Sequence, residues 1–346
     1  MRKKVKAGVC KAAQLRDGSR HPFGMLGGVT ALGGGELEVY RQIRNAVPIL
    51  DAAIGKLVRL TGGFTVSCGN RKAERELERF LKTVNAGRGQ VGLESFLAAF
   101  LQSMLVYGRA VGEMVVGGNE ITAVLWGDVT KLYVQEGTSA MEFAFGQWQD
   151  GEVKIFPRQN LILFAAWNPD EENPYGASVF RSMPFLVDVL LKIYSTIGTN
   201  WERAGNVRYS VVYKPQDEAG RIDAQERSEQ IASQWSQAMQ ESRHGVVRDF
   251  VAVGDVEIKV IGADGQILDS EVPVRQILEQ LVAKTGLPPF LLGLNWASTE
   301  RMSAQQTDLL TSELWAIRRT VEPVLLRICR LWMQLHGYAE DVEIVW

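Results

Sequence analysis

Cysteine and histidine are scarce in this sequence of 346 residues, with three of each. These six residues lie far apart along the chain: Cys10, Cys68, Cys329, His21, His244 and His336. An odd number of widely spaced cysteines excludes a disulfide framework and a CxxC zinc site. Because no histidine has another histidine near it, a zinc or di-iron centre is also not expected. The sequence therefore predicts no metal and no other cofactor.

Long apolar runs are also missing, since none approaches the ~20 residues that span a bilayer. The basic residues at the N-terminus are not followed by the apolar stretch of a signal peptide, so we expect no membrane partner and a reducing cytosol. Hydrophobic residues make up 46% of the chain and charged residues 23%, a globular composition. The length corresponds to two domains or one elaborated domain.

Signatures of catalysis are absent from the sequence. It contains no GxxxxGK[ST] nucleotide loop, no GxSxG and no HExxH. The acidic residues Asp170, Glu171 and Glu172 fall in a polar turn, where we interpret them as a solvated loop rather than an acid–base pair. We predict that the protein is not an enzyme. An oligomeric enzyme with an unrecognised site is the alternative.

Charge is distributed unevenly along the chain. Residues 1–20 hold seven lysines and arginines against one aspartate, a net charge of +6, which leaves −8 on the rest because the total is −2. We assign this basic arm to five residues in particular: Arg2, Lys3, Lys4, Lys6 and Lys11. The arm either contacts nucleic acid or an acidic protein surface, or is a solvated terminus. The acidic remainder argues against sequence-specific DNA binding.

Hydrophobic periodicity predicts helices in the first third and strands in the second. Helices are expected over 36–60, where Pro48 should introduce a kink, over 71–84 and over 93–106. The expected strands are 111–116, 120–125, 129–135, 141–146, 152–156 and 161–165. Because Gly- and Asp-containing turns separate them, we interpret these strands as one antiparallel meander.

Helices dominate the prediction for the second half. A helix over 178–204 carries two apolar stripes, Met183, Leu186, Leu190, Ile193, Ile197 and Trp201 on one and Val187, Leu191 and Tyr194 on the other. Two stripes indicate burial on more than one side, in a core or between subunits. A small α/β unit should follow, with strands 208–213, 246–253 and 256–261 and a polar helix 224–242. Helices 272–285 and 303–336 end the prediction, and Pro323 should bend the second of these.

Five short motifs, taken in order, resemble those of the tailed-bacteriophage portal (head–tail connector) family over about residues 36–336. They are Tyr107-Gly108-Arg109-Ala110, Asn173-Pro174-Tyr175-Gly176-Ala177-Ser178, Gly286-Leu287-Pro288-Pro289-Phe290-Leu291-Leu292-Gly293, Ser303-Ala304-Gln305-Gln306 and Glu322-Pro323. Each motif alone is weak, and their order and spacing carry the resemblance.

The resemblance implies an α+β portal fold with a mixed wing domain (antiparallel meander plus helices), a helical stem, a small α/β clip and a long kinked C-terminal helix. It divides the chain into segments: arm 1–35, wing 36–175, stem helix 176–206, clip 207–262, second stem helix 263–286, tunnel loop 287–303, and kinked wing helix with a short tail 304–346. About ten residues follow the last helix, so the helical crown of larger portals should be absent or vestigial.

The resemblance also implies a function. Such proteins form a ring of about twelve copies at one capsid vertex of the virion, assembled in the host cytoplasm, through which the genome enters and leaves. The expected partners are the major capsid protein, the terminase large subunit, the head–tail adaptor and double-stranded DNA without sequence specificity. Another oligomeric phage head or adaptor protein is the alternative within the same particle.

Two groups of residues are assigned roles by this resemblance. The DNA-channel loop would contain Leu294, Asn295, Trp296, Ala297, Ser298 and Thr299. The surface of the clip that docks the motor and the adaptor would contain Gln216, Asp217, Glu218, Arg221 and Asp223. The channel loop has no charge between Gly293 and Glu300, as contact with moving DNA without phosphate attraction requires. Trp296 would lie nearest the channel or pack against Leu292 or a neighbouring subunit.

Overall fold

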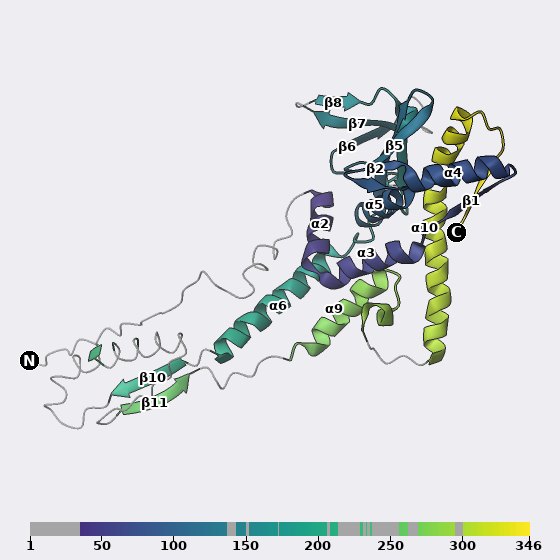
Figure 1. Ribbon diagram of the computed structural model, residues 1–346. Coiled ribbons are helices and arrows are strands. Elements are labelled where there is room, and N and C mark those ends of the chain that lie inside the picture. Colours follow the sequence, from purple (N-terminus) through teal and green to yellow (C-terminus); the bar gives the residue numbers. More distant parts are fainter. Residues whose placement is uncertain are drawn as a thin grey trace, which may run out of the picture. The chain divides into compact units, whose positions relative to one another are not determined.

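The computed structural model describes residues 35–136, 143–149, 152–171, 173–205, 208–213, 256–261, 269–294 and 300–346, with residues 229, 230, 233 and 236 (Figure 1). Contacts divide the chain into two units. Of the described residues, the larger comprises 35–193 together with Glu271–Trp346, and the smaller lies within Tyr194–Ser270. Helices and sheets are both present, as expected for an α+β fold.

The first helical segment is two helices, α2 (Glu36–Ala46) and α3 (Pro48–Thr61), and the expected single kinked helix is wrong. Val47 between them has an extended backbone, with φ −119° and ψ 95°. A residue before proline is disfavoured in the α region, and proline at the first helical position loses no hydrogen bond. Pro48 therefore starts a new helix rather than bending an existing one.

The helices α4 (Arg71–Thr83) and α5 (Leu93–Tyr107) agree with the prediction. The Asn70 side chain caps α4 by accepting hydrogen bonds from the N–H groups of Lys72 and Ala73 at 3.0 and 3.3 Å. The helix α5 is buried around most of its circumference, with Phe96, Phe100, Leu101, Met104 and Leu105 almost fully enclosed. It packs on strands β4 (Arg109–Gly117) and β5 (Glu120–Trp126), so it forms the centre of the larger unit.

The strands of the middle third form two sheets rather than the single meander that we predicted. One sheet has the order β3-β2-β5-β4-β9 and the other the order β6-β7-β8. The strands are β2 (Asn85–Gly87), β3 (Gln90–Val91), β4 (Arg109–Gly117), β5 (Glu120–Trp126), β6 (Leu132–Glu136), β7 (Phe143–Gln149), β8 (Glu152–Ile155) and β9 (Ile162–Ala166). Because β9 returns to pair with β4, the chain leaves the first sheet after β5 and re-enters it.

Apolar side chains from both sheets join in one cluster. Val111, Val129, Phe145 and Ile162 are buried in it. The rings of Phe143, Phe145 and Phe164 lie 5.1 to 6.4 Å apart between centroids, in tilted and edge-to-face arrangements. These contacts explain why the three-stranded sheet stays with the larger sheet although no ladder connects the two.

The helix α6 (Pro184–Gly205) begins six residues later than predicted, because residues 178–183 form turns.

In the smaller unit β10 (Arg208–Tyr213) and β11 (Val256–Ile261) pair in antiparallel fashion. The expected helix 224–242 lies mostly outside the described residues, although Glu229, Gln230, Ser233 and Ser236 are helical. The expected strand 246–253 lies wholly outside them. The helix α9 (Glu271–Lys284) agrees with the prediction and is followed by the short helix η2 (Pro289–Leu292).

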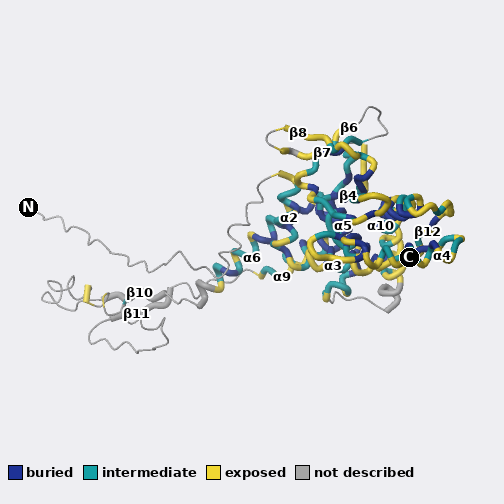
Figure 2. Tube along the Cα trace, turned by 45° about the horizontal axis from the view of Figure 1, so that its top comes forward, coloured by how far each residue is buried: buried dark blue, intermediate teal, exposed yellow. Residues whose placement is uncertain are grey.

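The helix α10 (Glu300–Leu335) continues through Pro323 as one helix of 36 residues. An apolar seam of this helix faces the rest of the larger unit: Leu310, Ile317, Val321, Val324 and Ile328 are buried. Figure 2 shows the dark blue, buried residues gathered around α3, α5 and α10 in the larger unit. After α10 the chain forms β12 (Val342–Val345), which pairs with β1 (Thr65–Cys68) in a ribbon that the sequence did not predict.

Polar anchors also tie α10 to the sheet and to α3. Arg327 donates to the carbonyls of Ile162 and Asn160 at 3.0 and 2.5 Å. Arg318 donates twice to the carbonyl of Thr61 at the end of α3, at 3.0 and 2.8 Å. Asn119, in the turn between β4 and β5, donates to the Leu335 carbonyl at the end of α10. These bonds satisfy carbonyls that would otherwise lack a partner.

Replacing Phe96 with alanine tests the central position of α5. The Phe96 ring is fully buried and lies against Gly112 of β4, where a Cβ atom would come within 2.8 Å of it. We expect Phe96→Ala to lower the free energy of unfolding by about 3–5 kcal/mol, measured by urea denaturation. Val91→Ala on the exposed edge strand β3 is the control and should change it by less than about 0.5 kcal/mol. Equal effects of the two substitutions would contradict this description of the core.

Candidate functional site

Two of the motifs singled out in the sequence meet in the structure. The turn 167–183 crosses the C-terminal end of α5, where Gly108 separates α5 from β4. The Trp167 N–H donates to the Gly108 carbonyl and the Ala177 N–H to the Trp167 carbonyl, both at 2.7 Å, and the Val179 N–H donates to the Leu105 carbonyl at 3.0 Å. The two motifs are therefore joined through their backbones. We call this place the junction.

Glycine is required at two positions of the junction. Gly108 has φ 78° and Gly176 has φ 97°, in the region that side chains disfavour. A Cβ atom on Gly176 would lie 2.0 Å from the Gly108 carbonyl oxygen, and one on Gly108 would lie 2.6 Å from the backbone of Ala177 and Ser178. The two chain segments can approach this closely only because neither residue carries a side chain.

Ser178 completes the backbone contacts of the junction. Its buried hydroxyl donates to the Val106 carbonyl at 2.5 Å and accepts from the Phe180 N–H at 2.9 Å. Because its hydrogen is committed to a carbonyl, this hydroxyl is not an activated nucleophile. Its position supports a structural role.

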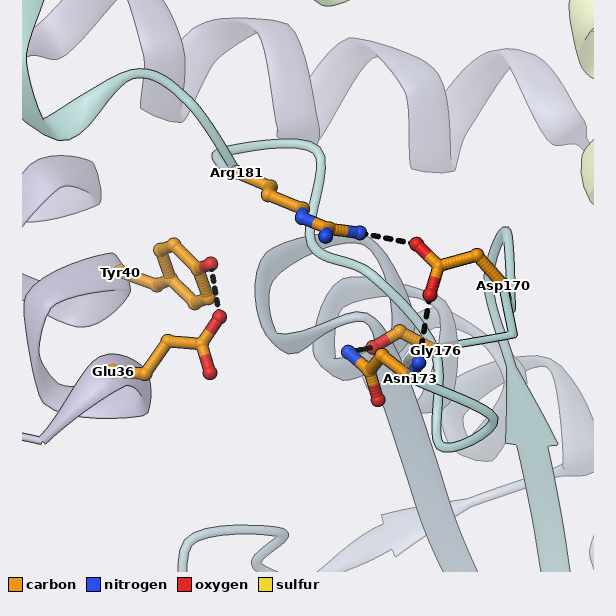
Figure 3. Close-up of polar contacts among 6 residues, drawn as sticks. All are labelled: Glu36, Tyr40, Asp170, Asn173, Gly176 and Arg181. Atoms are coloured by element: carbon orange, nitrogen blue, oxygen red, sulfur yellow. Dashed lines mark hydrogen bonds and ion pairs between the residues drawn. The ribbon is translucent and has the colours of Figure 1, made fainter.

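Charged side chains lie on the outer side of the junction (Figure 3). Arg181 pairs with one oxygen of Asp170 at 2.5 Å, while the other oxygen accepts the Asn173 N–H at 2.7 Å. Both members of the ion pair are about 43% exposed, so the pair contributes less than about 1 kcal/mol. The interpretation of Asp170 as part of a polar turn agrees with this geometry. Asp170 organises the turn.

The helix α2 contributes two further polar groups on this side. The Tyr40 hydroxyl donates to the Glu36 carboxylate at 2.5 Å (Figure 3), and burial together with this bond raises the pKa of Tyr40. Arg109 is half-buried, its Nε has no hydrogen-bond partner, and burial lowers its pKa. Because its pKa is raised, the Tyr40 hydroxyl stays protonated and serves as the hydrogen-bond donor to Glu36.

A cavity of about 390 Å³ lies beside the junction, between the turn, the end of α9 and α10. Its lining includes the charged residues Asp170, Arg181, Lys284 and Glu313 and the apolar residues Leu57 and Leu105. Two carboxylates and two cations face it, with no histidine or cysteine among the lining residues.

The described residues also contain no group of three or more His, Cys, Asp or Glu side chains that could hold a metal ion. In the same parts of the chain, no helix combines the length and apolarity that crossing a bilayer demands.

Large apolar side chains are exposed at the helices that follow the junction. Phe185 in the first turn of α6 is 74% exposed, and Val272 in the first turn of α9 is also exposed. Trp201, in the part of α6 that belongs to the smaller unit, is 67% exposed. Of the two alternatives predicted for its stripe, burial in a core does not apply to Trp201, and burial between subunits stays a prediction. The residues Val187, Leu190 and Leu191 of the expected stripes are buried as predicted.

The structure describes only one of the residues predicted to form sites. Leu294 is half-buried, and its N–H donates to the Pro289 carbonyl at 3.1 Å, which closes η2. Outside the described residues lie Asn295, Trp296, Ala297, Ser298, Thr299, Gln216, Asp217, Glu218, Arg221, Asp223, Arg2, Lys3, Lys4, Lys6 and Lys11. Sequence reasoning missed the pairing of Gly108 with Gly176. The only sign of this pairing in the sequence was that both motifs contain a glycine.

No protein-family model matches the sequence, and no curated protein does. Solved structures do share its fold. A chain in the neck of an empty gene transfer agent (GTA) particle, computed with C6 symmetry, aligns with TM-score 0.64 and 17% identity over 90% of this chain and 85% of that chain. A chain in the neck of the native GTA particle, computed with C12 symmetry, aligns with TM-score 0.59 and 17% identity over 86% and 80%.

A third similar structure is that of a portal protein. The HK97-family phage portal protein from Corynebacterium diphtheriae aligns with TM-score 0.50 and 11% identity over 88% of this chain and 93% of that chain. The chain described here thus has the fold of a phage portal protein, as its motifs indicated. The fold extends over nearly the whole of both chains.

Replacing Gly176 with alanine tests the junction. The new Cβ atom would meet the Gly108 carbonyl oxygen, so we expect a loss of more than about 4 kcal/mol in the free energy of unfolding, or no soluble folded chain. Gly118→Ala is the matched control, because Gly118 also has a positive φ (63°) but open space around it. It should cost only about 1–2 kcal/mol. If the two variants unfold at the same urea concentration, the close approach is not important for stability.

Proposed function

We propose that this chain is the subunit of a portal ring, the conduit for genome packaging and ejection at one vertex of a phage-like capsid. The observation that carries the proposal is the portal fold, matched over 80–93% of the length of three solved chains. Two of those chains belong to neck assemblies computed with C12 and C6 symmetry. A ring of about twelve copies is the corresponding proposal for this chain.

Exposed apolar helix surfaces support assembly of several copies. Phe185, Trp201 and Val272 leave large apolar side chains in water in the single chain. Soluble monomers rarely expose contiguous apolar surface, and obligate interfaces are rich in it. In the proposed ring, neighbouring copies cover the helices α6 and α9, which form the stem.

The remaining segments receive roles from the same proposal. The wing is 36–175 with 304–346, the clip that docks the terminase and the adaptor is 207–262, and the tunnel loop is 287–303. The basic arm 1–35 contacts capsid protein or DNA in the virion. The junction joins wing to stem, because Gly108 ends the central wing helix and Gly176 lies shortly before α6.

The charge of the chain suits a conduit rather than a DNA-binding surface. Outside residues 1–20 the net charge is −8, since the total is −2 and those residues carry +6. Basic residues would bind phosphates and release counterions, which would hold the DNA in place. We propose that the ring only guides DNA and that a partner motor hydrolyses ATP.

Native mass spectrometry and electron microscopy of the purified full chain test the ring. We expect a closed ring of about twelve copies with an open axial channel. A chain that stays monomeric or dimeric at every concentration would instead support a different head or adaptor protein.

A second test addresses the tunnel loop. We expect that replacing 295–299 with a Gly-Ser linker of equal length leaves ring assembly intact but lowers the amount of DNA packaged or retained per particle. The control replaces Arg88 and Gly89, in the turn between β2 and β3, with Gly-Ser. Normal filling and retention with the changed loop would show that the loop is only a connector.

A further inference from the structure

The two halves of α10 differ in how they are packed. From Ile317 onward the helix contributes Ile317, Val321, Val324, Leu325, Ile328, Cys329, Trp332 and Met333 to the core. Between residues 305 and 316, all of which are described, eight of twelve are exposed and only Leu310 is buried. Helices in proteins are stabilised mainly by packing of an apolar face. Three turns of helix with one buried residue therefore lack most of that stabilisation in the single chain.

The exposed face of this half-helix has a defined composition. At 100° per residue, Leu309 and Trp315 lie at its two margins, on the side away from Leu310 and Ile317. Leu309 is 67% exposed and Trp315 is 47% exposed. Between them lie Gln305, Asp308, Ser312 and Ala316, of which only Asp308 is charged. Leu309 and Trp315 therefore flank a strip with a single charge, and an element that packs across this strip would remove both apolar side chains from water. We call this surface the Leu309 face.

We propose that the Leu309 face is a surface through which one copy of this chain packs against the next copy, an inference that rests on the proposed ring. The occupant follows from the position of the face in the chain. The helix α10 begins at Glu300, directly within the segment assigned to the channel. Copies in a ring are closest to one another near its axis, so an element that follows the channel loop has a neighbouring copy on each side.

The symmetry of a ring adds a second argument. Head-to-tail contacts in a ring join two different surfaces of the same protein. The single chain exposes a separate set of apolar residues at the starts of α6 and α9, Phe185 and Val272. The Leu309 face is thus one of two distinct apolar surfaces, as such a contact requires.

Photo-crosslinking of the purified full chain identifies the occupant. The crosslinking amino acid p-benzoylphenylalanine replaces Leu309 in one variant and Trp315 in another. In the control variant it replaces Val91, which is 60% exposed on the edge strand β3. We expect illumination to produce covalent multimers of the chain from positions 309 and 315, and only monomer from position 91.

Substitutions measure how much the face contributes. We expect the double variant Leu309→Ser/Trp315→Gln to raise the concentration at which half of the rings dissociate by about 30-fold, which corresponds to about 2 kcal/mol. Val91→Ser should leave that concentration unchanged. Circular dichroism melting of the dissociated chains should be the same for both variants, since the substituted side chains are exposed.

The outcomes separate the two proposals. If the wild-type chain forms rings, but positions 309 and 315 give no crosslinks and the double variant assembles normally, the Leu309 face is not an interface and the ring proposal stands. If the wild-type chain forms no rings under any condition, both proposals fail.

Discussion

The crossing of the backbone at Gly108 and Gly176 fixes the relative positions of three parts of the larger unit. It ends the buried helix α5, starts the strand β4, and holds the turn from which the chain proceeds to α6. The bonds between these parts are backbone to backbone, with the Ser178 hydroxyl bridging Val106 and Phe180. Such bonds depend on chain geometry, so they keep the start of α6 in register with the core whatever side chains surround it. The surface pair of Asp170 and Arg181 adds little energy and mainly shapes the turn.

A second constraint is the attachment of α10 over the edge of the five-stranded sheet. The strand β9 is an edge strand, and Arg327 donates to the carbonyl of Ile162 in this strand and to that of Asn160 just before it. The Arg318 guanidinium lies 5.3 Å from the Trp315 ring and 5.4 Å from the Trp346 ring, and it also binds the carbonyl that ends α3. These contacts fasten the C-terminal half of the helix. Its N-terminal half receives no comparable support from the described parts of this chain, which explains the contrast in burial along one continuous helix.

Local patterns predicted the helices well, because their apolar positions repeat every three or four residues and their ends carry proline, asparagine or glycine. They gave the strands of the middle third but not their sheets. The return of β9 to β4 and the pairing of β1 with β12 join residues far apart in the sequence, and no local signal encodes that. At Pro48 the pattern predicted one helix where the structure has two. The apolar residues keep their helical spacing across Pro48, although the proline starts a new helix. The proposed channel and clip residues lie outside the described residues, with Leu294 as the exception.

Charge and apolar surface act in opposite directions when copies of this chain approach one another. Outside residues 1–20 each copy carries a net charge of −8, so these parts of neighbouring copies repel one another in the proposed ring. Salt limits that repulsion to about 8 Å at physiological ionic strength, whereas apolar burial yields about 25 cal/mol for each Å² removed from water. In the proposed ring, burial of the exposed side chains Phe185, Trp201, Leu309 and Trp315 holds copies together once they touch. In the proposed ring the acidic groups that remain outside these contacts repel the phosphates of DNA. The proposed ring thus combines apolar helix faces that bind neighbouring copies with an acidic remainder that does not hold DNA.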